Sequence, residues 1–235
     1  MTDLVLSDSL AAARRRLASA LAEAGRPPGD AALLAVSKTK PAALIREAYR
    51  LGQRDFGENY LQEALDKQAE LADLDDIVWH FIGPLQSNKT REAAGRFAWI
   101  HSLDREKIAR RLNAQRPDAL PPLNVCLQVN VSGEASKSGV AVAELPALAE
   151  AVAALPRLRL RGLMAIPAPA ADPREQGRPF ARLREALEIL RERHPEAPLD
   201  TLSMGMSGDL EAAVAEGATL VRLGTAIFGA RRRPD

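Results

Sequence analysis

Short apolar runs alternate along the chain with longer segments in which apolar residues recur every three or four positions. An unbroken apolar run of about four to eight residues is typical of a buried strand, and the three-to-four spacing is typical of an amphipathic helix. The pattern predicts strands at residues 33–37, 53–56, 77–82, 98–101, 123–130, 159–165, 199–203 and 219–223, and helices at 42–51, 60–72, 87–94, 104–114, 143–155, 173–193 and 208–216.

A further amphipathic helix is predicted ahead of the first strand, over residues 4–24. Arginines occupy much of its polar side, and Gly25 and Pro27 end it. Its apolar face is formed by Leu6, Leu10, Leu17 and Leu21.

Eight strands that alternate with helices, without a break in composition, predict a single α/β domain over residues 1–235. The expected fold is a parallel (β/α)8 TIM barrel, which typically takes roughly 250 residues, with the extra N-terminal helix added to it. An open, doubly wound sheet is the alternative. It is disfavoured because no GxGxxG motif follows the first strand.

The stretch "LLAVSKTKP", residues 33–41, places a lysine at the end of an apolar strand. A strand that leaves the core with Lys38 and Lys40 in water is one interpretation. The other is a reactive amine, because the functional groups of such barrels lie at the carboxyl ends of the strands. Partial burial of Lys38 would lower its amine pKa, and a neutral amine can attack a carbonyl to form a Schiff base.

The loops after the seventh and eighth strands, in "TLSMGMSGDLEAA" and "LVRLGTAIFG", are rich in small residues. In a TIM barrel these two loops commonly bind phosphate, because small residues let backbone N–H groups approach an anion. Ser207 is also explained as the N-cap of helix 208–216. The phosphate candidates are Ser203, Gly205, Gly224 and Thr225.

Arg222 interrupts the last apolar strand. A buried guanidinium needs an acceptor, so Arg222 either forms an ion pair with a neighbouring strand or contacts a ligand. An amine, a phosphate cradle and an inward arginine at one barrel mouth fit a phosphorylated carbonyl compound. Two classes of protein qualify: a Schiff-base phosphosugar aldolase, and a protein that binds pyridoxal 5′-phosphate (PLP).

The amino-acid composition and the distribution of apolar residues exclude some classes of binding partner. Lys and Arg number 32 and Asp and Glu 31, and a net charge near +1 disfavours nucleic acid. The N-terminal residues lack the apolar run of a signal peptide, and no stretch approaches the roughly 18 apolar residues of a membrane helix. We therefore expect a cytoplasmic protein that does not bind membranes.

The single cysteine and the three histidines predict neither a disulfide nor a metal site. Cys126 lies in an apolar stretch and is expected in the core. His80 and His101 lie at or near strand ends and are expected to be hydrogen-bonded barrel residues, since neither forms a recognisable base–nucleophile pattern. His194 precedes a proline at a helix end and is expected at the surface.

Six motifs, "LLAVSKTKP", "FGENYLQEA", "WHFIGPLQSNK", "VNVSGEASKSG", "GLMAIPAP" and "RLGTAIFGAR", together resemble the pyridoxal phosphate homeostasis proteins, which are similar to the barrel domain of alanine racemase. The resemblance implies that Lys38 carries PLP as a Schiff base and that Arg222 faces the pyridine nitrogen. It also implies that Ser203, Gly224 and Thr225 hold the phosphate and that Asn59 lines the cofactor site.

The resemblance implies a PLP carrier without robust catalysis, which binds and hands over PLP in vitamin B6 and amino-acid homeostasis. Alanine racemases add a C-terminal β-domain with a catalytic tyrosine, which this sequence is not expected to form after its last βα unit. A weak amino-acid racemase is the alternative. We expect a monomer, with apo PLP-dependent enzymes as possible acceptors and Lys137 as a possible second amine.

Overall fold

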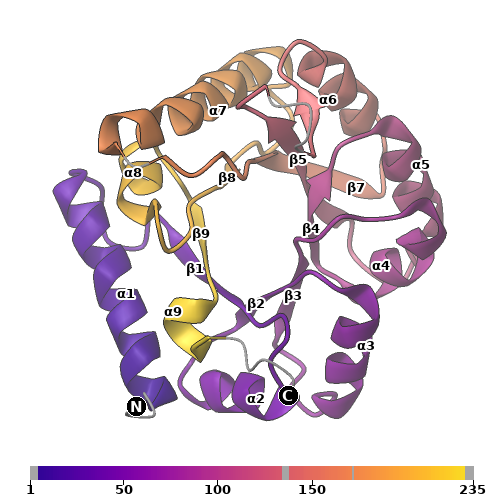
Figure 1. Ribbon diagram of the computed structural model, residues 1–235. Helices are drawn as coiled ribbons and strands as arrows, with labels where there is room; N and C mark the ends of the chain where they lie inside the picture. Colours follow the sequence, from indigo (N-terminus) through magenta and orange to yellow (C-terminus); the bar gives the residue numbers. More distant parts are fainter. Residues whose placement is uncertain (1–4, 134–137, 171, 231–235) are drawn as a thin grey trace.

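The computed structural model of the chain describes residues 5–133, 138–170 and 172–230. Eight parallel strands close into a barrel with helices around the outside (Figure 1). The predicted (β/α)8 barrel is therefore confirmed. Its strands, in chain order, are β1 (Ala32–Val36), β2 (Asp55–Glu58), β3 (Val78–Phe81), β4 (Trp99–Leu103), β5 (Leu123–Asn130), β7 (Leu158–Met164), β8 (Thr201–Ser203) and β9 (Leu220–Leu223).

The helices form a ring outside the strands in Figure 1, and the last helix is a single turn. Each except the last connects one barrel strand to the next, as the alternation in the sequence predicts. They are α2 (Ala42–Arg50), α3 (Leu61–Glu70), α4 (Thr90–Arg96) after the 3₁₀ turn η1 (Ser87–Lys89), α5 (Glu106–Gln115), α6 (Leu145–Ala153), α7 (Pro173–Arg193), α8 (Leu210–Ala215) and α9 (Thr225–Phe228).

The predicted strands and helices agree with the structure to within about two residues at their boundaries when η1 is counted with α4, but three features differ. The first is α9, since no helix was predicted after the last strand. A two-residue strand, β6 (Val140–Ala141), pairs with the end of β5 and has no counterpart in the prediction. The predicted N-cap of α8 is wrong: the helix begins at Leu210 and its N-cap residue is Asp209, not Ser207. The Asp209 carboxylate instead closes the preceding turn by accepting the Met206 N–H at 2.6 Å.

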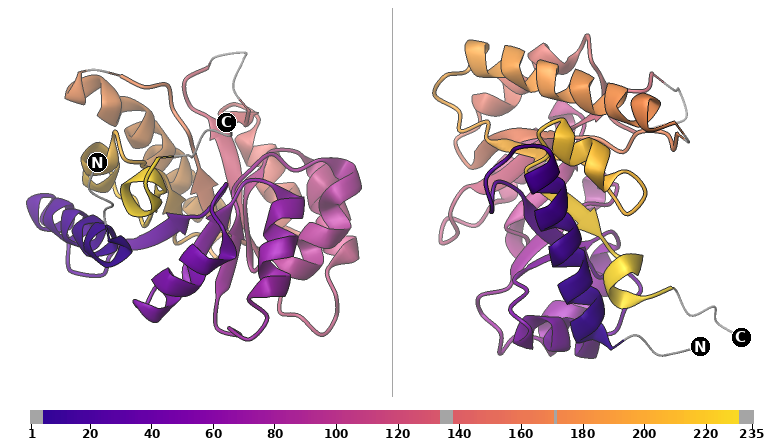
Figure 2. Two further views of the ribbon diagram at one scale, coloured as in Figure 1. Left: turned by 60° about the horizontal axis from the view of Figure 1, so that its bottom comes forward. Right: turned by 90° about the vertical axis from the view of Figure 1, so that its left-hand side faces the viewer.

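The predicted N-terminal helix, α1 (Leu6–Glu23), packs against α8 and α9, as the right-hand view of Figure 2 shows. Ser9 donates a buried hydrogen bond to the Ile227 carbonyl at 2.6 Å. Arg16 binds both carboxylate oxygens of Glu211. Through these contacts α1 supports the two short helices that follow the last two barrel strands.

Apolar side chains between the strands and the helices form the main core. The inside of the barrel is different. It holds a small apolar cluster of Leu34, Val36, Ile82 and Leu220, together with several buried polar side chains. Some of these polar side chains form hydrogen bonds between strands that are not neighbours in the sheet, such as β4 and β8, and must therefore point into the barrel. The polar side chains inside the barrel include His80, His101, Ser203 and Arg222.

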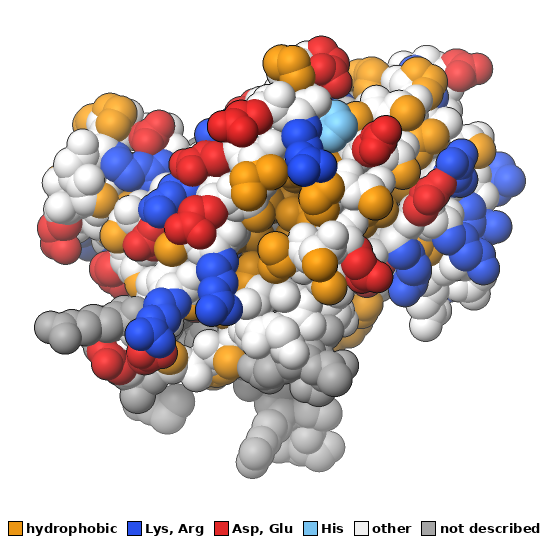
Figure 3. Space-filling model, turned by 90° about the horizontal axis from the view of Figure 1, so that it is seen from above, with side chains coloured by type: hydrophobic (Ala, Val, Ile, Leu, Met, Phe, Trp, Pro, Cys, Tyr) orange, Lys and Arg blue, Asp and Glu red, His pale blue; other side chains and the backbone are white. Residues whose placement is uncertain are grey.

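The outer surface carries charges of both signs. Figure 3 shows Lys, Arg, Asp and Glu side chains interspersed over the face seen from above Figure 1, in keeping with the near-zero net charge. None of the helices in the described part of the chain combines the length and apolarity needed to cross a membrane.

Candidate functional site

Lys38 lies just beyond the carboxyl end of β1. The strand ends at Val36, the Ser37 N–H still donates to the Gly57 carbonyl of β2, and Lys38 follows in a turn. Leu34 and Val36 face the barrel interior, and a continued two-residue period would direct Lys38 to the same side. Its side chain is half-buried, and its backbone lies at the carboxyl end of the barrel.

The residue before Lys38 is anchored by a buried ion pair that the sequence did not reveal. Ser37 donates its hydroxyl to Glu58 at 2.5 Å, and Lys67 donates to both the Ser37 carbonyl and the Glu58 carboxylate at 2.8 Å. Burial raises the pKa of Glu58, and the charge of Lys67 offsets part of that rise. Glu58 and Lys67 come from β2 and α3, so the anchor is a tertiary contact.

The residue after Lys38 is anchored by the same cluster. Glu63 accepts hydrogen bonds from the Thr39 N–H and from Lys67, both at 2.5 Å. Thr39 adopts a positive φ of 62°, which is uncommon for a β-branched residue. The backbone of Lys38 is thus anchored through the residues on both sides of it, which fixes the point from which its side chain extends.

Asn59 follows β2 at the same end of the barrel. Its side-chain oxygen Oδ1 is buried and has no hydrogen-bond partner among the described residues. The backbone of Asn59 lies so close to Gly83, after β3, that a Cβ at Gly83 would stand 2.1 Å from the Asn59 carbonyl oxygen. A buried acceptor without a partner is costly, so a water molecule or a ligand is expected to donate to this oxygen.

Arg222, on β9, is 4 % exposed and lies inside the barrel. It donates to the Ser203 carbonyl at 2.6 Å, to the Ser203 hydroxyl at 2.8 Å and to the Ala165 carbonyl at 2.8 Å. Burial lowers the pKa of Arg222 to about 10, and the charge of Asp209 opposes that shift. Arg222 forms no ion pair with any carboxylate of the described residues, so its positive charge is held by neutral acceptors alone.

Ser203, at the end of β8, is fully buried. Its hydroxyl is bound to both Arg222 and His101, so a role in holding phosphate stays a prediction. Gly224 and Thr225 form the start of α9 directly after β9. Gly224 packs closely against β1, since a Cβ there would lie 3.1 Å from the Val36 carbonyl oxygen.

The six predicted site residues lie on one continuous arc of the barrel. They follow or belong to β2, β1, β9 and β8, which are successive neighbours in the sheet, and Arg222 is the register partner of Leu34 in β1. Two of the predicted residues, Ser203 and Arg222, are joined directly by a hydrogen bond. Lys137 lies outside the described residues.

The two strand histidines are hydrogen-bonded inside the barrel, as expected. His80 contacts Asp55 at 3.0 Å and His101 at 2.9 Å, and His101 contacts Ser203 at 2.7 Å. Burial lowers the pKa of His80 and lowers that of His101 well below its usual range.

The structure confirms the position predicted for Cys126 but not the one predicted for His194. Cys126 is fully buried, and burial raises the pKa of its thiol to about 12, so it is a core residue as predicted. The surface position predicted for His194 is wrong. Its side chain is only 12 % exposed, because the chain folds back after α7 and Ala197 donates to the His194 carbonyl.

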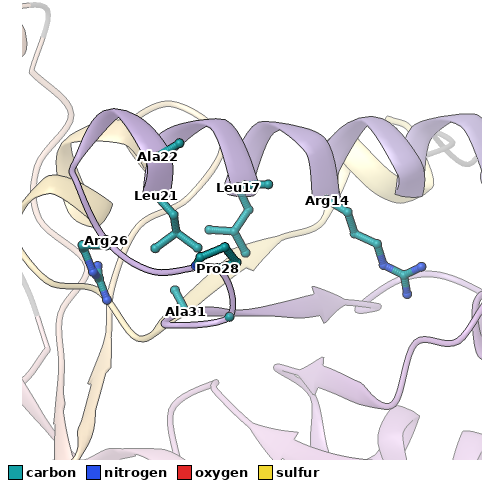
Figure 4. Close-up of a pocket in the computed structure, with 9 residues that line it drawn as sticks. Arg14, Leu17, Leu21, Ala22, Arg26, Pro28 and Ala31 are labelled. Carbon is teal, nitrogen blue, oxygen red and sulfur yellow. The ribbon is translucent and has the colours of Figure 1, made fainter.

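A cavity of about 250 Å³ lies away from these residues, between α1 and the loop that leads into β1 (Figure 4). Leu17, Leu21 and Ala31 give it apolar walls. Its two arginines are already engaged, Arg14 with the Leu51 carbonyl and Arg26 with Asp30. It lies at the amino end of β1, opposite to Lys38, and is not part of the candidate site.

Comparison with known proteins defines the class to which this barrel and its mouth belong. Residues 9–232 match the family "Alanine racemase, N-terminal domain". Alanine racemase of Corynebacterium glutamicum shares the fold, with a TM-score of 0.72 and 23% identity over 95% of this chain and 62% of that chain.

More similar relatives define the family. The pyridoxal phosphate homeostasis protein of Pseudomonas aeruginosa is 66% identical over 96% of both chains, and that of Escherichia coli K12 is 55% identical over 96% of this chain and 97% of its relative. PipY of Synechococcus elongatus, solved with PLP bound, has a TM-score of 0.84 and 42% identity over 96% of this chain and all of that one. The chain belongs to the pyridoxal phosphate homeostasis protein family.

Proposed function

We propose that this protein binds PLP at the carboxyl mouth of the barrel and serves in intracellular PLP homeostasis and amino-acid balance. One observation carries the proposal: a half-buried lysine follows β1 and a buried arginine lies on the neighbouring strand β9, toward the end where such barrels bind ligands. The family and the PLP-bound PipY structure identify the ligand as PLP.

The residues present fit the groups of PLP. Lys38 would hold the cofactor through its amine, which condenses with the aldehyde and releases water. Arg222 would donate a hydrogen bond to the ring nitrogen, since a guanidinium offers only donors. The unpartnered Oδ1 of Asn59 would accept a hydrogen bond from a donor at the site. Gly224 and Thr225 would hold the phosphate, whereas the Ser203 hydroxyl is already bound to Arg222 and His101.

The chemistry that PLP supplies when bound is stabilisation of negative charge on a substrate carbon, best with a protonated ring nitrogen. Arg222 keeps its own proton at neutral pH even with its lowered pKa of about 10. It therefore favours an unprotonated ring nitrogen and suits a protein that holds PLP without consuming amino acids. We propose a cytoplasmic monomer that hands PLP to apo PLP-dependent enzymes, with weak amino-acid racemisation as the alternative activity.

The test locates the covalent attachment. The protein is incubated with PLP, its visible absorption is recorded, and borohydride reduction followed by peptide mapping finds the labelled lysine. We expect the label on Lys38, its loss in Lys38→Ala and its retention in the matched control Lys40→Ala. A label on Lys40 or Lys67, or equal labelling of the wild type and Lys38→Ala, would overturn the assignment.

A further inference from the structure

A continuous chain of hydrogen bonds crosses the inside of the barrel from Arg222 to the amino end of β2. Arg222 Nη1 lies 2.8 Å from Ser203 Oγ, which lies 2.7 Å from His101 Nδ1. His101 Nε2 lies 2.9 Å from His80 Nδ1, and His80 Nε2 lies 3.0 Å from Asp55 Oδ1. Five side chains from β9, β8, β4, β3 and β2 take part, although none of them is close to the next in sequence.

The chemistry of the two ends fixes the direction of this chain. A guanidinium only donates hydrogen bonds and an ionised carboxylate only accepts them. Both histidines are buried, which lowers the pKa of each, so each ring is neutral with one donor and one acceptor nitrogen.

The proton positions follow one by one from these constraints. Asp55 accepts, so His80 carries its proton on Nε2 and accepts at Nδ1. His101 must then donate from Nε2 and accept at Nδ1, so the Ser203 hydroxyl points to His101 and its oxygen accepts from Arg222. The Arg222 end is compatible with this answer, because the Ser203 oxygen accepts from the guanidinium while its proton is donated to His101. Every donor in the chain therefore has its acceptor.

We propose that Asp55, His80 and His101 are positioning residues that hold the Ser203 hydroxyl away from the barrel mouth and thereby fix the guanidinium of Arg222. Hydrogen bonds in such a chain polarise one another, so the carboxylate at one end strengthens the contact at the other. The part that concerns the cofactor rests on the proposed function. Asp55, at the opposite end of the barrel from Lys38, then influences the environment of the PLP ring nitrogen without contacting PLP.

The first arm of the test measures proton positions and needs no ligand. Long-range ¹H–¹⁵N NMR at pH 7 distinguishes protonated from unprotonated ring nitrogens. The protein contains only three histidines, so single His→Gln variants assign the signals. We expect neutral His80 and His101, each protonated at Nε2 alone. A proton on Nδ1 of His101, or a charged ring at either position, would overturn the direction of the chain.

The second arm compares two substitutions at His80, which contacts none of the predicted site residues directly. Gln can donate to Asp55 and accept from His101, so His80→Gln keeps the direction of the chain, whereas His80→Leu cuts it. We expect His80→Leu to shift the visible spectrum of bound PLP and to weaken PLP binding about tenfold, the worth of one hydrogen bond to a charged group. His80→Gln is expected to retain both properties.

Two variants of the partly exposed Asp55 keep the test valid if His80→Leu misfolds. If His80→Leu does not fold, Asp55→Leu replaces it and Asp55→Asn, which keeps an acceptor, is the control, because the Asp55 side chain is 36% exposed. Unchanged spectrum and affinity in a folded Leu variant would show that the chain is only structural. Absence of PLP binding by the wild type would instead refute the proposed function and leave the NMR result standing.

Discussion

At the scale of single residues, the mouth of the barrel depends on one close backbone approach. Gly83 lies against the backbone of Asn59, and the Ser102 hydroxyl donates to the Gly83 carbonyl at 2.5 Å. Asn59 is thereby held where its buried Oδ1 has no partner among the described residues. The absence of a side chain at Gly83 is what permits this position of Asn59.

Gly83→Ala is expected to move Asn59 and to weaken PLP binding by more than tenfold. A Cβ at this position would lie 2.1 Å from the Asn59 carbonyl oxygen and 2.7 Å from its Cα, so the backbone must shift. Overpacking of this kind costs about 1–3 kcal/mol of folding stability. Absorbance titration with PLP and thermal unfolding measure the two effects.

The matched control is Gly95→Ala in α4. A Cβ at Gly95 would meet only Pro117 Cγ, at 3.8 Å, and alanine is favoured over glycine in helices by about 1 kcal/mol. Stability should therefore be unchanged or raised, and PLP affinity unchanged. Wild-type affinity in Gly83→Ala would show that Asn59 does not contribute to the cofactor site.

At the scale of elements, α1 belongs to the cooperative fold although it precedes the first barrel strand. Its apolar face is buried against the elements that follow β8 and β9. The contacts of Ser9 with α9 and of Arg16 with α8 support the two loops predicted to bind phosphate. A change in the core face of α1 should therefore affect the whole barrel.

Leu10→Ala is expected to lower the free energy of unfolding by about 2–5 kcal/mol, because Leu10 is 1 % exposed and its truncation leaves a cavity. Arg16→Ala, on the same helix, removes an ion pair with Glu211 whose side chains are 37% and 51% exposed. That loss should stay below about 1 kcal/mol. Urea unfolding measures both, and a Leu10→Ala value similar to that of Arg16→Ala would show that α1 is dispensable.

The sequence is sufficient to predict the helices and strands whose apolar residues repeat with a clear local period. Strands such as β5 and helices such as α7 repeat apolar residues with a clear period, and their positions were predicted closely. The strand β6 has two residues, Val140 and Ala141, too few to show a period. The start of α8 was missed because Ser207 and Asp209 are both residue types that favour the N-cap position, and the turn that Asp209 closes with the Met206 N–H places the start of the helix after Asp209.

The site was predicted less completely than the fold. Lys38 and Arg222 could be found because a charged residue interrupts or ends an apolar strand. The cluster around Lys67 could not, because lysine on a helix is usually exposed and only the tertiary fold places it between Glu58 and Glu63. The two strand histidines were expected to be hydrogen-bonded, but their partners come from distant strands.

At the scale of the whole molecule, the barrel contains few candidates for a second base beside the cofactor site. Racemisation requires proton transfer on both faces of the reacting carbon, and the sequence has only two tyrosines. Tyr49 donates to Asp76, a hydrogen bond that raises the Tyr49 pKa, and the Arg54 guanidinium lies 3.9 Å over its ring. Tyr49 lies near the end of α2 and stays protonated at neutral pH.

Alanine racemisation is therefore expected to stay near the rate of free PLP. Tyr60 is the tyrosine that lies at the mouth, between Asn59 and α3, but it is 51% exposed and is not held by a structure that excludes water. The measurement follows D-alanine formed from L-alanine by the PLP-loaded protein, with Lys38→Ala and Tyr60→Phe in parallel. All three proteins should give the same low rate. A high wild-type rate that disappears in both variants would identify Lys38 and Tyr60 as the two bases, and the weak racemase would then be the correct function.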